Sequence, residues 1–336
     1  MDATENLIPR PRKGTLPVTS VTAETLPAFL KKQSARLRKW VEGVGFTGAP
    51  NTWCLVPGRQ QGVERVLVGI DPEAGPWTYA FLPSALPGGS YQLDPEPEPT
   101  RANQAALGWA LAGYAFDRYK KVESKDVKLV WPKEADRALV KRTASAIFLV
   151  RDLVNTPAED LGPAQLADAA QALGRAHGAK VVVIKGDALL QKNYPLIHAV
   201  GRASTSEPRL IDLRWDGSGH RKAGTAEPKR ITLVGKGVIF DSGGLDLKPA
   251  AGMKLMKKDM GGSAHVLGLA GMIMDAGLPV RLRVLVPAVE NAVAGNAFRP
   301  MDIIRSRKGL TVEIGNTSTP RADSFSATPS PMPSRK

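Results

Sequence analysis

The chain has 336 residues, enough for about two domains, and its 43% hydrophobic and 23% charged content is ordinary for a globular protein. One cysteine, Cys54, excludes an internal disulfide and a cysteine metal site. No apolar run reaches the ~18–20 residues of a membrane helix, and the N-terminus lacks the apolar stretch of a secretory signal. We therefore expect a cytoplasmic protein with no membrane partner.

Basic residues are in excess and give a formal net charge of +14, which raises the question of a polyanionic partner. Lys and Arg are nevertheless spread along the whole chain, with only short pairs such as Lys31-Lys32 and Lys257-Lys258. A nucleic-acid site usually gathers basic residues in a block or interleaves them with aromatic residues. The pattern favours a solvated basic surface, and nucleic-acid binding remains the less favoured alternative.

The first 134 residues are expected to form a small α/β domain without a catalytic cluster. Residues 1–20 are expected to be an extended, proline-bearing lead-in, and helical spacing of apolar residues predicts a helix over 26–41. Short strands separated by Gly and Pro turns follow within 50–98, namely TWCLVPG, ERVLVGID and WTYAFL. A helix over 102–121 and a strand DVKLVW complete this part.

The second domain is predicted to begin at residue 135 with a long amphipathic helix, 135–154. It ends before Asn155-Thr156-Pro157, because proline disfavours helical geometry in the preceding residue. Strands and helices then alternate, which predicts an α/β domain with a largely buried sheet. The predicted order is helix 163–177, strand KVVVIKG, a short helix from Asp187, strands HAVGRA, RLIDLRW and RITLVGKGVIF, helix 261–276 and strand VRLRVLVPAV.

Side chains suited to chemistry gather in VGKGVIFDSGGLDLKPAAGMKLMKKDMGG, residues 234–262. An apolar strand carries Lys236 and then Asp241 to a Gly-rich turn, where a sheet presents side chains to a ligand. Lys248 follows in a loop, and Asp259 precedes the next helix. Two carboxylates and two lysines thus converge on one strand edge. Carboxylate oxygens suit Mg²⁺ and Mn²⁺ and also bind Zn²⁺.

Other interpretations of this segment are a zinc site, a phosphate loop and a structural turn. None of the four histidines has a zinc-ligand spacing such as HExxH, and His265 is expected to be a packed helix residue. A phosphate loop needs GxxxxGK followed by Ser or Thr, whereas Lys236 is followed by Gly237. From the pattern alone, a structural Gly-rich turn with surface salt bridges remains an alternative.

The order Lys236, Asp241, Lys248, Asp259 within VGKG…FDSGG…LKP…KxDMGG resembles the leucyl aminopeptidase family. The resemblance extends to RDLVNTP (151–157), GRASTSEPRLIDLRW (201–215), PAVENAVAGNAFRPMDI (287–303) and TVEIGNT (311–317). It implies a small N-terminal α/β domain and a C-terminal mixed-sheet α/β metallo-aminopeptidase domain, 135–317. It also implies peptide substrates, release of N-terminal residues such as leucine, and a homohexamer.

The resemblance also implies roles for individual residues. Lys236, Asp241 and Asp259 would be ligands of two divalent metal ions, Mn²⁺ or Zn²⁺ with Mg²⁺ as a further candidate. Lys236 would have to bind as the neutral amine, since an ammonium has no lone pair. Lys248 would be the catalytic lysine that stabilises an oxyanion, and Met256 would line the pocket for the substrate's first side chain. Such a paired metal site activates a water and polarises the scissile carbonyl.

The chain departs from the family after Asn316-Thr317. There the family continues Asp-Ala-Glu-Gly-Arg, in which the Asp and Glu are metal ligands and the Arg belongs to the catalytic centre. Here Ser318, Pro320 and Ala322 stand at those three positions. Neither serine nor proline supplies an ionised carboxylate. We therefore expect a catalytic domain that is incomplete at its C-terminus and has impaired activity.

Residues 318–336 are dominated by Ser, Pro and Thr and are expected to be disordered. One permissible codon set for Ser318–Lys336, read from the last nucleotide of a TCG codon for Ser318, encodes Asp-Ala-Glu-Gly-Arg-Leu-Ile-Leu-Cys-Asp-Ala-Leu-Ala-Tyr-Ala-Val-Ala-Glu. This is the missing motif followed by an amphipathic helix. The tail is therefore expected to arise from a frameshift near Thr317, in the gene or in its sequencing.

Overall fold

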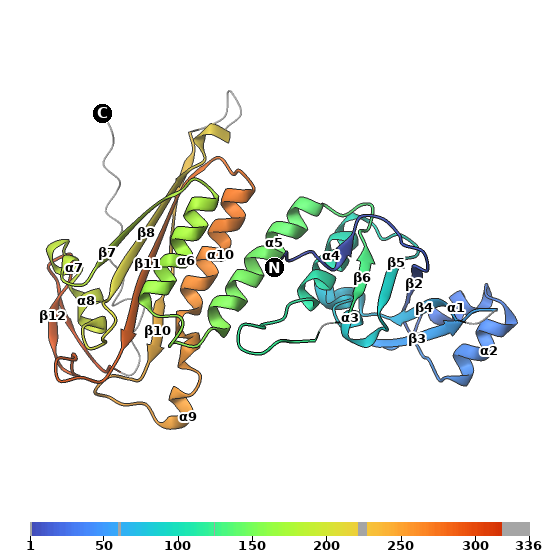
Figure 1. Ribbon diagram of the computed structural model, residues 1–336, viewed down its shortest axis with the longest axis horizontal. Coiled ribbons are helices and arrows are strands. Elements are labelled where there is room, and N and C mark those ends of the chain that lie inside the picture. Colours follow the sequence, from blue (N-terminus) through green and yellow to red (C-terminus); the bar gives the residue numbers. More distant parts are fainter. Residues whose placement is uncertain (1, 60–61, 124, 221–226, 318–336) are drawn as a thin grey trace. The chain divides into compact units, whose positions relative to one another are not determined.

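The computed structural model describes residues 2–59, 62–123, 125–220 and 227–317. The chain divides into two compact units, Met1–Phe148 and Leu149–Lys336 (Figure 1). The division falls inside helix α5 (Arg137–Asn155), and the predicted boundary between residues 134 and 135 lies just before that helix. The tail 318–336, predicted to be disordered, lies outside the described residues.

Unit 1 is built on a six-stranded sheet in the order β1-β6-β5-β2-β4-β3, in which only β3 is antiparallel to its neighbour. Its core surrounds two fully buried aromatic side chains, Tyr91 and Trp109. Residues Val140, Ala144 and Phe148 of α5 pack into the same core. The strands are β1 (Leu7–Ile8), β2 (Leu16–Val21), β3 (Thr52–Pro57), β4 (Val63–Gly69), β5 (Gly89–Leu93) and β6 (Val127–Val130). The helices are α1 (Leu26–Lys31), α2 (Ala35–Gly43), the 3-10 helix η1 (Pro72–Thr78), α3 (Leu82–Ala85) and α4 (Pro99–Ala112).

Several expectations for unit 1 are corrected by the structure. The segment expected to be a lead-in contains the central strand β2, whose Val18 and Val21 are buried. The helix predicted over 26–41 is two helices, because the Ser34 hydroxyl accepts a hydrogen bond from the Leu37 amide (3.3 Å) and starts α2 anew. WTYAFL is not a strand: it joins η1 to α3, whose Pro83 suits the first turn of a helix.

Unit 2 contains a mixed sheet, as predicted. The strand order is β10-β11-β8-β7, with β9 also paired to β11; β9 and β10 run parallel to β11, whereas β8 is antiparallel to both of its neighbours. The strands are β7 (Lys180–Lys185), β8 (Arg209–Asp216), β9 (Lys229–Val234), β10 (Gly237–Asp241) and β11 (Val280–Asn291), with a separate hairpin of β12 (Ile303–Arg305) and β13 (Thr311–Glu313). The helices are α6 (Pro163–Ala176), α7 (Ala188–Gln191), α8 (Pro195–Gly201), the 3-10 helix η2 (Ser218–His220), α9 (Ala250–Met253), the 3-10 helix η3 (Met256–Met260) and α10 (Gly261–Asp275).

Both faces of this sheet carry apolar side chains, in the alternation that a pleated strand imposes. Ile211 and Leu213 of β8 face α6 and α10, which lie along one side of the sheet (Figure 1). Leu210 faces the opposite side, where it packs with Ile197 and Val200 of α8. This packing corrects the strand predicted at HAVGRA. The segment is largely helical, because Pro195 starts a helix and Ile197 and Val200 recur at helical spacing.

A charged group is buried in the same sheet. The Arg283 guanidinium of β11 donates hydrogen bonds to both oxygens of Asp212 on β8, over 3.0 and 2.8 Å, and Arg214 donates to the same carboxylate. Burial raises the pKa of Asp212, but the hydrogen bonds and charges of Arg283 and Arg214 outweigh burial and hold it below its usual range.

We expect Asp212→Ala to lower the free energy of unfolding by about 3 kcal/mol at pH 7, because it leaves the buried Arg283 without its counter-ion. Asp216→Ala is the matched control on the same strand: its partner Arg281 lies 3.8 Å away and both are exposed to solvent, so we expect less than about 1 kcal/mol. Since the folded pKa of Asp212 is depressed, its contribution is present above the unfolded pKa of about 3.9 and is lost as the pH falls below it. Urea unfolding between pH 3 and 7 measures the free energy of unfolding of both variants and its pH dependence. Equal losses of stability in the two variants would contradict the role of Asp212 as the counter-ion of Arg283.

Within the described residues, no helix is both long enough and apolar enough to cross a bilayer.

Candidate metal centre

The site is built on a break in an edge strand. β9 and β10 both pair with β11, but the chain leaves regular pairing at Gly235 and Lys236, so the single strand predicted at RITLVGKGVIF is two. A Cβ on Gly235 would lie 2.7 Å from the Gly262 carbonyl oxygen and from Ser263 Cα. The first turn of α10 therefore packs directly on the break. The Ser263 amide donates a hydrogen bond to the Lys236 carbonyl (2.8 Å) and fixes the strand against the helix.

We expect Gly235→Ala to lower the free energy of unfolding by about 1–3 kcal/mol, because the new methyl group would force the start of α10 away from the strand. Gly252→Ala in α9 is the control: a Cβ there meets no atom within 4 Å, and alanine favours helix, so we expect no loss of stability. Chemical denaturation of both variants measures the difference. Equal stability of Gly235→Ala and the wild type would contradict this packing.

Asp241 ends β10 at a sharp turn. The next glycines, Gly243 (φ +94°) and Gly244 (φ +61°), have positive φ, a backbone conformation that other residues rarely adopt, which explains the predicted Gly-rich turn. The side chain of Asp241 is almost wholly buried. Its Oδ1 accepts hydrogen bonds from the Gly243 amide (2.9 Å) and from Asn291 Nδ2 (2.7 Å). The turn and a side chain of β11 therefore hold this carboxylate in place.

The structure pairs the four predicted polar residues across short distances. Lys248 Nζ lies 3.0 Å from Asp241 Oδ2, and Lys236 Nζ lies 2.8 Å from Asp259 Oδ1. Lys236 comes from the strand break, and Asp259 from η3, which leads directly into α10. All four side chains are at least three-quarters buried. The four residues, predicted to converge at one strand exit, therefore form two pairs: Lys236–Asp259 at the break before β10 and Lys248–Asp241 at the end of β10.

Within the described part of the chain, one carboxylate oxygen of Asp259 accepts no hydrogen bond. Its Oδ2 is buried and has no hydrogen-bond partner among the described residues. Burial raises the pKa of Asp259 above its usual range, and the nearby Asp241 carboxylate acts in the same direction, whereas Lys236 and Lys248 partly oppose them. A buried carboxylate oxygen without a donor, beside a second carboxylate, suits a bound cation. The residues present therefore fit a divalent ion.

Other predicted residues have simpler placements. Met256 is half-buried on η3, the short helix that also carries Asp259. His265 is exposed on α10, and its Nδ1 donates to the Gly261 carbonyl of its own helix. Across the residues that the structure describes, no three Asp, Glu, His or Cys side chains gather as a metal site. Ser318, Pro320 and Ala322, which stand at the family's further site positions, lie outside the described residues.

Sequence reasoning missed two residues that contact this centre. Asn291, at the end of β11, donates to Asp241 as described, and also to the Thr317 carbonyl (2.8 Å). Thr317 is fully buried, and its hydroxyl donates to the Gly243 carbonyl (2.7 Å). Both residues lie in segments that carry the family resemblance, PAVENAV and EIGNT, but nothing in those segments assigned Asn291 a contact with Asp241 or Thr317 a contact with the loop that follows Asp241.

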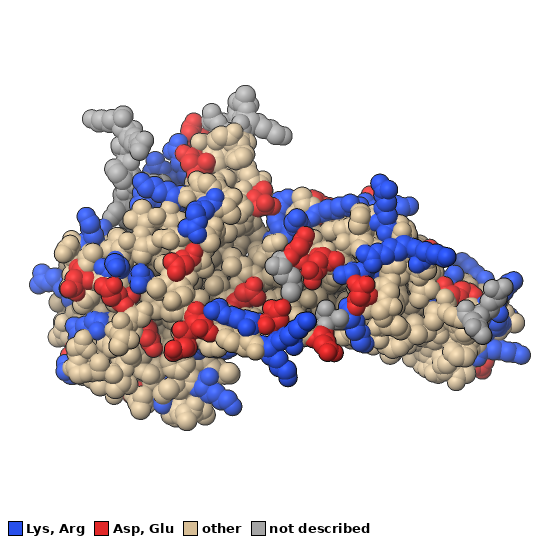
Figure 2. All heavy atoms as spheres, in the orientation of Figure 1, with Lys and Arg blue, Asp and Glu red and all other residues tan. Residues whose placement is uncertain are grey.

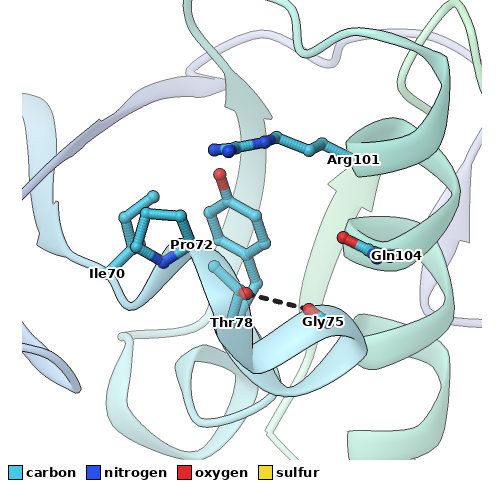
Figure 3. Close-up of a pocket in the computed structure, with 7 residues that line it drawn as sticks. Ile70, Pro72, Gly75, Thr78, Arg101 and Gln104 are labelled. Atoms are coloured by element: carbon cyan, nitrogen blue, oxygen red, sulfur yellow. Dashed lines mark hydrogen bonds between the residues drawn. The ribbon is translucent and has the colours of Figure 1, made fainter.

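A small pocket lies in unit 1 and contains none of the predicted site residues. It is lined by Ile70, Pro72, Gly75, Thr78, Tyr79, Arg101 and Gln104. Figure 3 shows Arg101 extending across it from α4 and the Thr78 hydroxyl donating to the Gly75 carbonyl (2.8 Å). The Tyr79 hydroxyl shares a hydrogen bond with the Ser20 hydroxyl (2.9 Å), and burial raises the pKa of Tyr79. These contacts close the pocket's wall rather than expose reactive groups.

Charged side chains are mixed over the visible surface. Figure 2 shows Lys and Arg scattered over both units, with Asp and Glu between them. On this face the charge distribution agrees with the predicted solvated basic surface and shows no single basic patch.

The chain matches two family models. Residues 148–320 match the cytosol aminopeptidase family catalytic domain, and residues 16–132 match the N-terminal domain of these M17 aminopeptidases. Among curated relatives, a "Probable cytosol aminopeptidase" of Rhizobium rhizogenes is 35% identical over 77% of this chain and 50% of its own length. Peptidase B of Pectobacterium carotovorum is 38% identical over 63% of this chain and 49% of its own length. The chain thus spans about half the length of these relatives.

Solved structures give the same result. The cytosol aminopeptidase of Coxiella burnetii superimposes with a TM-score of 0.86 at 41% identity, covering 94% of this chain and 67% of that one. The bottromycin maturation enzyme BotP in complex with Mn superimposes with a TM-score of 0.75 at 30% identity, covering 90% of this chain and 65% of that one. The predicted fold class, a small α/β domain followed by a mixed-sheet α/β domain, is confirmed. The chain belongs to the cytosol aminopeptidase family.

Proposed function

We propose that this chain is a metallo-aminopeptidase that releases N-terminal amino acids, of the leucine type, from peptides. The observation that carries the proposal is the pairing of Lys236 with Asp259 at the break before β10 and of Lys248 with Asp241 at its end. The order and spacing of these residues resemble the metal-site segment of the leucyl aminopeptidase family, which supports the proposal. The Mn²⁺ complex of the related BotP supports divalent metal ions, either Mn²⁺ or Zn²⁺ with Mg²⁺ as a further candidate.

Each residue has a proposed role. Lys236, through its neutral amine, and the carboxylates of Asp241 and Asp259 would hold the metal ions. When bound, the metal ions would supply Lewis acidity for the scissile carbonyl and lower the pKa of a bound water. Lys248 would donate a hydrogen bond to the oxygen that becomes negative in the tetrahedral intermediate. Met256 would line the pocket for the substrate's first side chain.

Metal binding tests the site directly. We expect calorimetric titration of the 336-residue chain with Mn²⁺ to detect one bound ion rather than two, because Ser318 and Pro320 stand where the family has an Asp and a Glu. Asp259→Asn should abolish this binding, because the variant replaces a buried carboxylate by a neutral amide. Asp168→Asn, an exposed change on α6, is the control and should bind as the wild type does. A wild-type chain that binds no Mn²⁺ would contradict the metal site.

We further propose that the activity is impaired because the reading frame changes near Thr317. Ser318, Pro320 and Ala322 stand at the family's Asp, Glu and Arg positions, and one permissible codon set for the tail encodes that motif in another frame. The nucleotide sequence across codons 315–320 decides this. A coding strand without a GACGCCGAGGG-like stretch there would remove the frame proposal and leave the metal site untouched.

The proposed partners are peptides, with a homohexamer as the assembly. The relatives' description as cytosol aminopeptidases supports the expected cytoplasmic location. The alternative, a non-catalytic basic protein that binds nucleic acid, rests only on the net charge of +14. DNA binding that weakens steeply with salt and needs no metal would favour that alternative.

A further inference from the structure

The geometry points to Asn291 and Thr317 as positioning residues that hold Asp241 and the loop to Lys248 in place before any metal ion binds. This inference rests on the proposed metal site and adds two residues that contact Asp241 and its loop without themselves being proposed ligands.

Asn291 uses both of its amide hydrogens at this site. Nδ2 donates to Asp241 Oδ1 (2.7 Å) and to the Thr317 carbonyl oxygen (2.8 Å). Both facing atoms are acceptors, so the orientation of the amide is fixed: its NH₂ group, and not its oxygen, must point at them. Asn291 is 1% exposed, and its Oδ1 has no hydrogen-bond partner among the described residues. The buried side chain of Asn291 thus uses its NH₂ group for two hydrogen bonds and leaves its side-chain carbonyl oxygen unbonded in the described structure. This indicates that the NH₂ donors are the reason for an asparagine at this position.

The backbone of Asn291 holds the start of the same turn. Its carbonyl oxygen accepts from the Ser242 amide (3.1 Å) and from the Ser242 hydroxyl (2.8 Å). One residue of β11 thus fixes both the Asp241 carboxylate and the residue that follows it.

Thr317 holds the rest of the loop. Its hydroxyl donates to the Gly243 carbonyl (2.7 Å) and accepts from the Asp246 amide (3.1 Å). The Lys248 amide in turn donates to the Ser242 carbonyl (3.0 Å), which closes the loop that brings Lys248 to Asp241. The side chain of Thr317 therefore bridges two points of the segment between the two site residues.

Loss of these contacts is expected to lower the affinity for metal ions, because the loop would have to become ordered on binding. Without these contacts, Asp241 and Lys248 would have to be fixed when the metal binds, which lowers the affinity. Partners that orient metal ligands typically contribute about 10–100-fold to metal affinity. We therefore expect about a tenfold or larger loss of Mn²⁺ affinity when the donors are removed.

Two pairs of variants of the full 336-residue chain test the inference. Thr317→Val removes the hydroxyl and keeps the shape, whereas Thr317→Ser keeps the hydroxyl. Asn291→Leu removes both donors, whereas Asn296→Leu is the matched control, since the Asn296 amide bonds only the Arg202 carbonyl in the described structure. Hydrogen exchange of the metal-free chain reports the order of residues 242–248, and calorimetry reports Mn²⁺ affinity.

We expect faster exchange at residues 242–248 and weaker Mn²⁺ binding in Thr317→Val and Asn291→Leu, with Thr317→Ser and Asn296→Leu like the wild type. Unchanged Mn²⁺ affinity in Thr317→Val, or faster exchange spread equally over β11 and α10, would overturn the positioning role. If the wild type binds no Mn²⁺, the proposed metal site fails; the exchange data alone then decide whether Asn291 and Thr317 fix the loop.

Discussion

Expressing the proposed alternative reading frame after Thr317 is expected to raise the hydrolysis of a leucyl anilide in the presence of Mn²⁺ by more than about a hundredfold over the 336-residue chain. Altering the partners of metal ligands already lowers affinity or activity by about 10–100-fold, and this change replaces two proposed ligands outright. Release of the anilide chromophore at matched protein and metal concentrations measures the gain.

The expected gain in activity has its physical reason in the negative charge of the site. The described centre contains two carboxylates and two lysine side chains, so it has little negative charge to offset two divalent ions. Two unit charges 4 Å apart interact by about 4 kcal/mol at an effective dielectric of 20, and two divalent ions at that separation repel four times as strongly. The Asp and Glu of the alternative frame would add the missing negative charge.

A restored chain in which only those two residues are changed to Asn and Gln is the control, since it regains the downstream segment without the charge. It should remain as inactive as the 336-residue chain. Full activity of the 336-residue chain itself would show that the motif is unnecessary and would contradict the proposed impairment.

Changing Asp241 and Asp259 together to Ala in the restored chain is expected to reduce its peptidase rate to below about 1%, because two of the three proposed metal ligands from this segment are lost. A double variant that removes the same charge from exposed positions, Glu159→Ala with Asp168→Ala, is the control. It should keep the rate of the restored chain. A restored chain that retains its rate without Asp241 and Asp259 would show that the catalytic centre lies elsewhere.

The double variant also bears on stability. The Asp241 carboxylate is buried and accepts two hydrogen bonds, so its removal should destabilise unit 2 as well. Thermal unfolding should therefore accompany the rate measurement. Asp241→Asn with Asp259→Asn keeps the side-chain size, and a folded protein of this kind without peptidase activity would separate loss of the ligands from loss of the fold.

Long elements with strong periodicity were predictable from the sequence. α5, α6, β7, β8 and β11 lie where the apolar spacing placed them, because each carries an apolar run or stripe that continues over several turns or pleats. Short elements were not. α8 has seven residues, so its apolar pattern fitted a strand as well as a helix, and β2 was obscured by the proline at its start.

At the site, the four polar residues were predictable because they lie within one short segment of the sequence, residues 236–259, around β10. The break at Gly235 was not, since it depends on how closely α10 approaches the strand. The roles of Asn291 and Thr317 were also hidden. Asn291 reaches Asp241 from 50 residues further along the chain, and no local pattern reveals which amide of a neighbouring strand will face a given carboxylate.

The helix that joins the two units limits how the protein can be cut for production in pieces. Val140, Ala144 and Phe148 of α5 fill the core of unit 1, and Leu153 of the same helix fills the core of unit 2. A fragment that stops at residue 134, or one that starts after residue 155, would expose apolar surface that this helix normally covers. Soluble fragments of either unit should therefore each retain their own copy of residues 137–155.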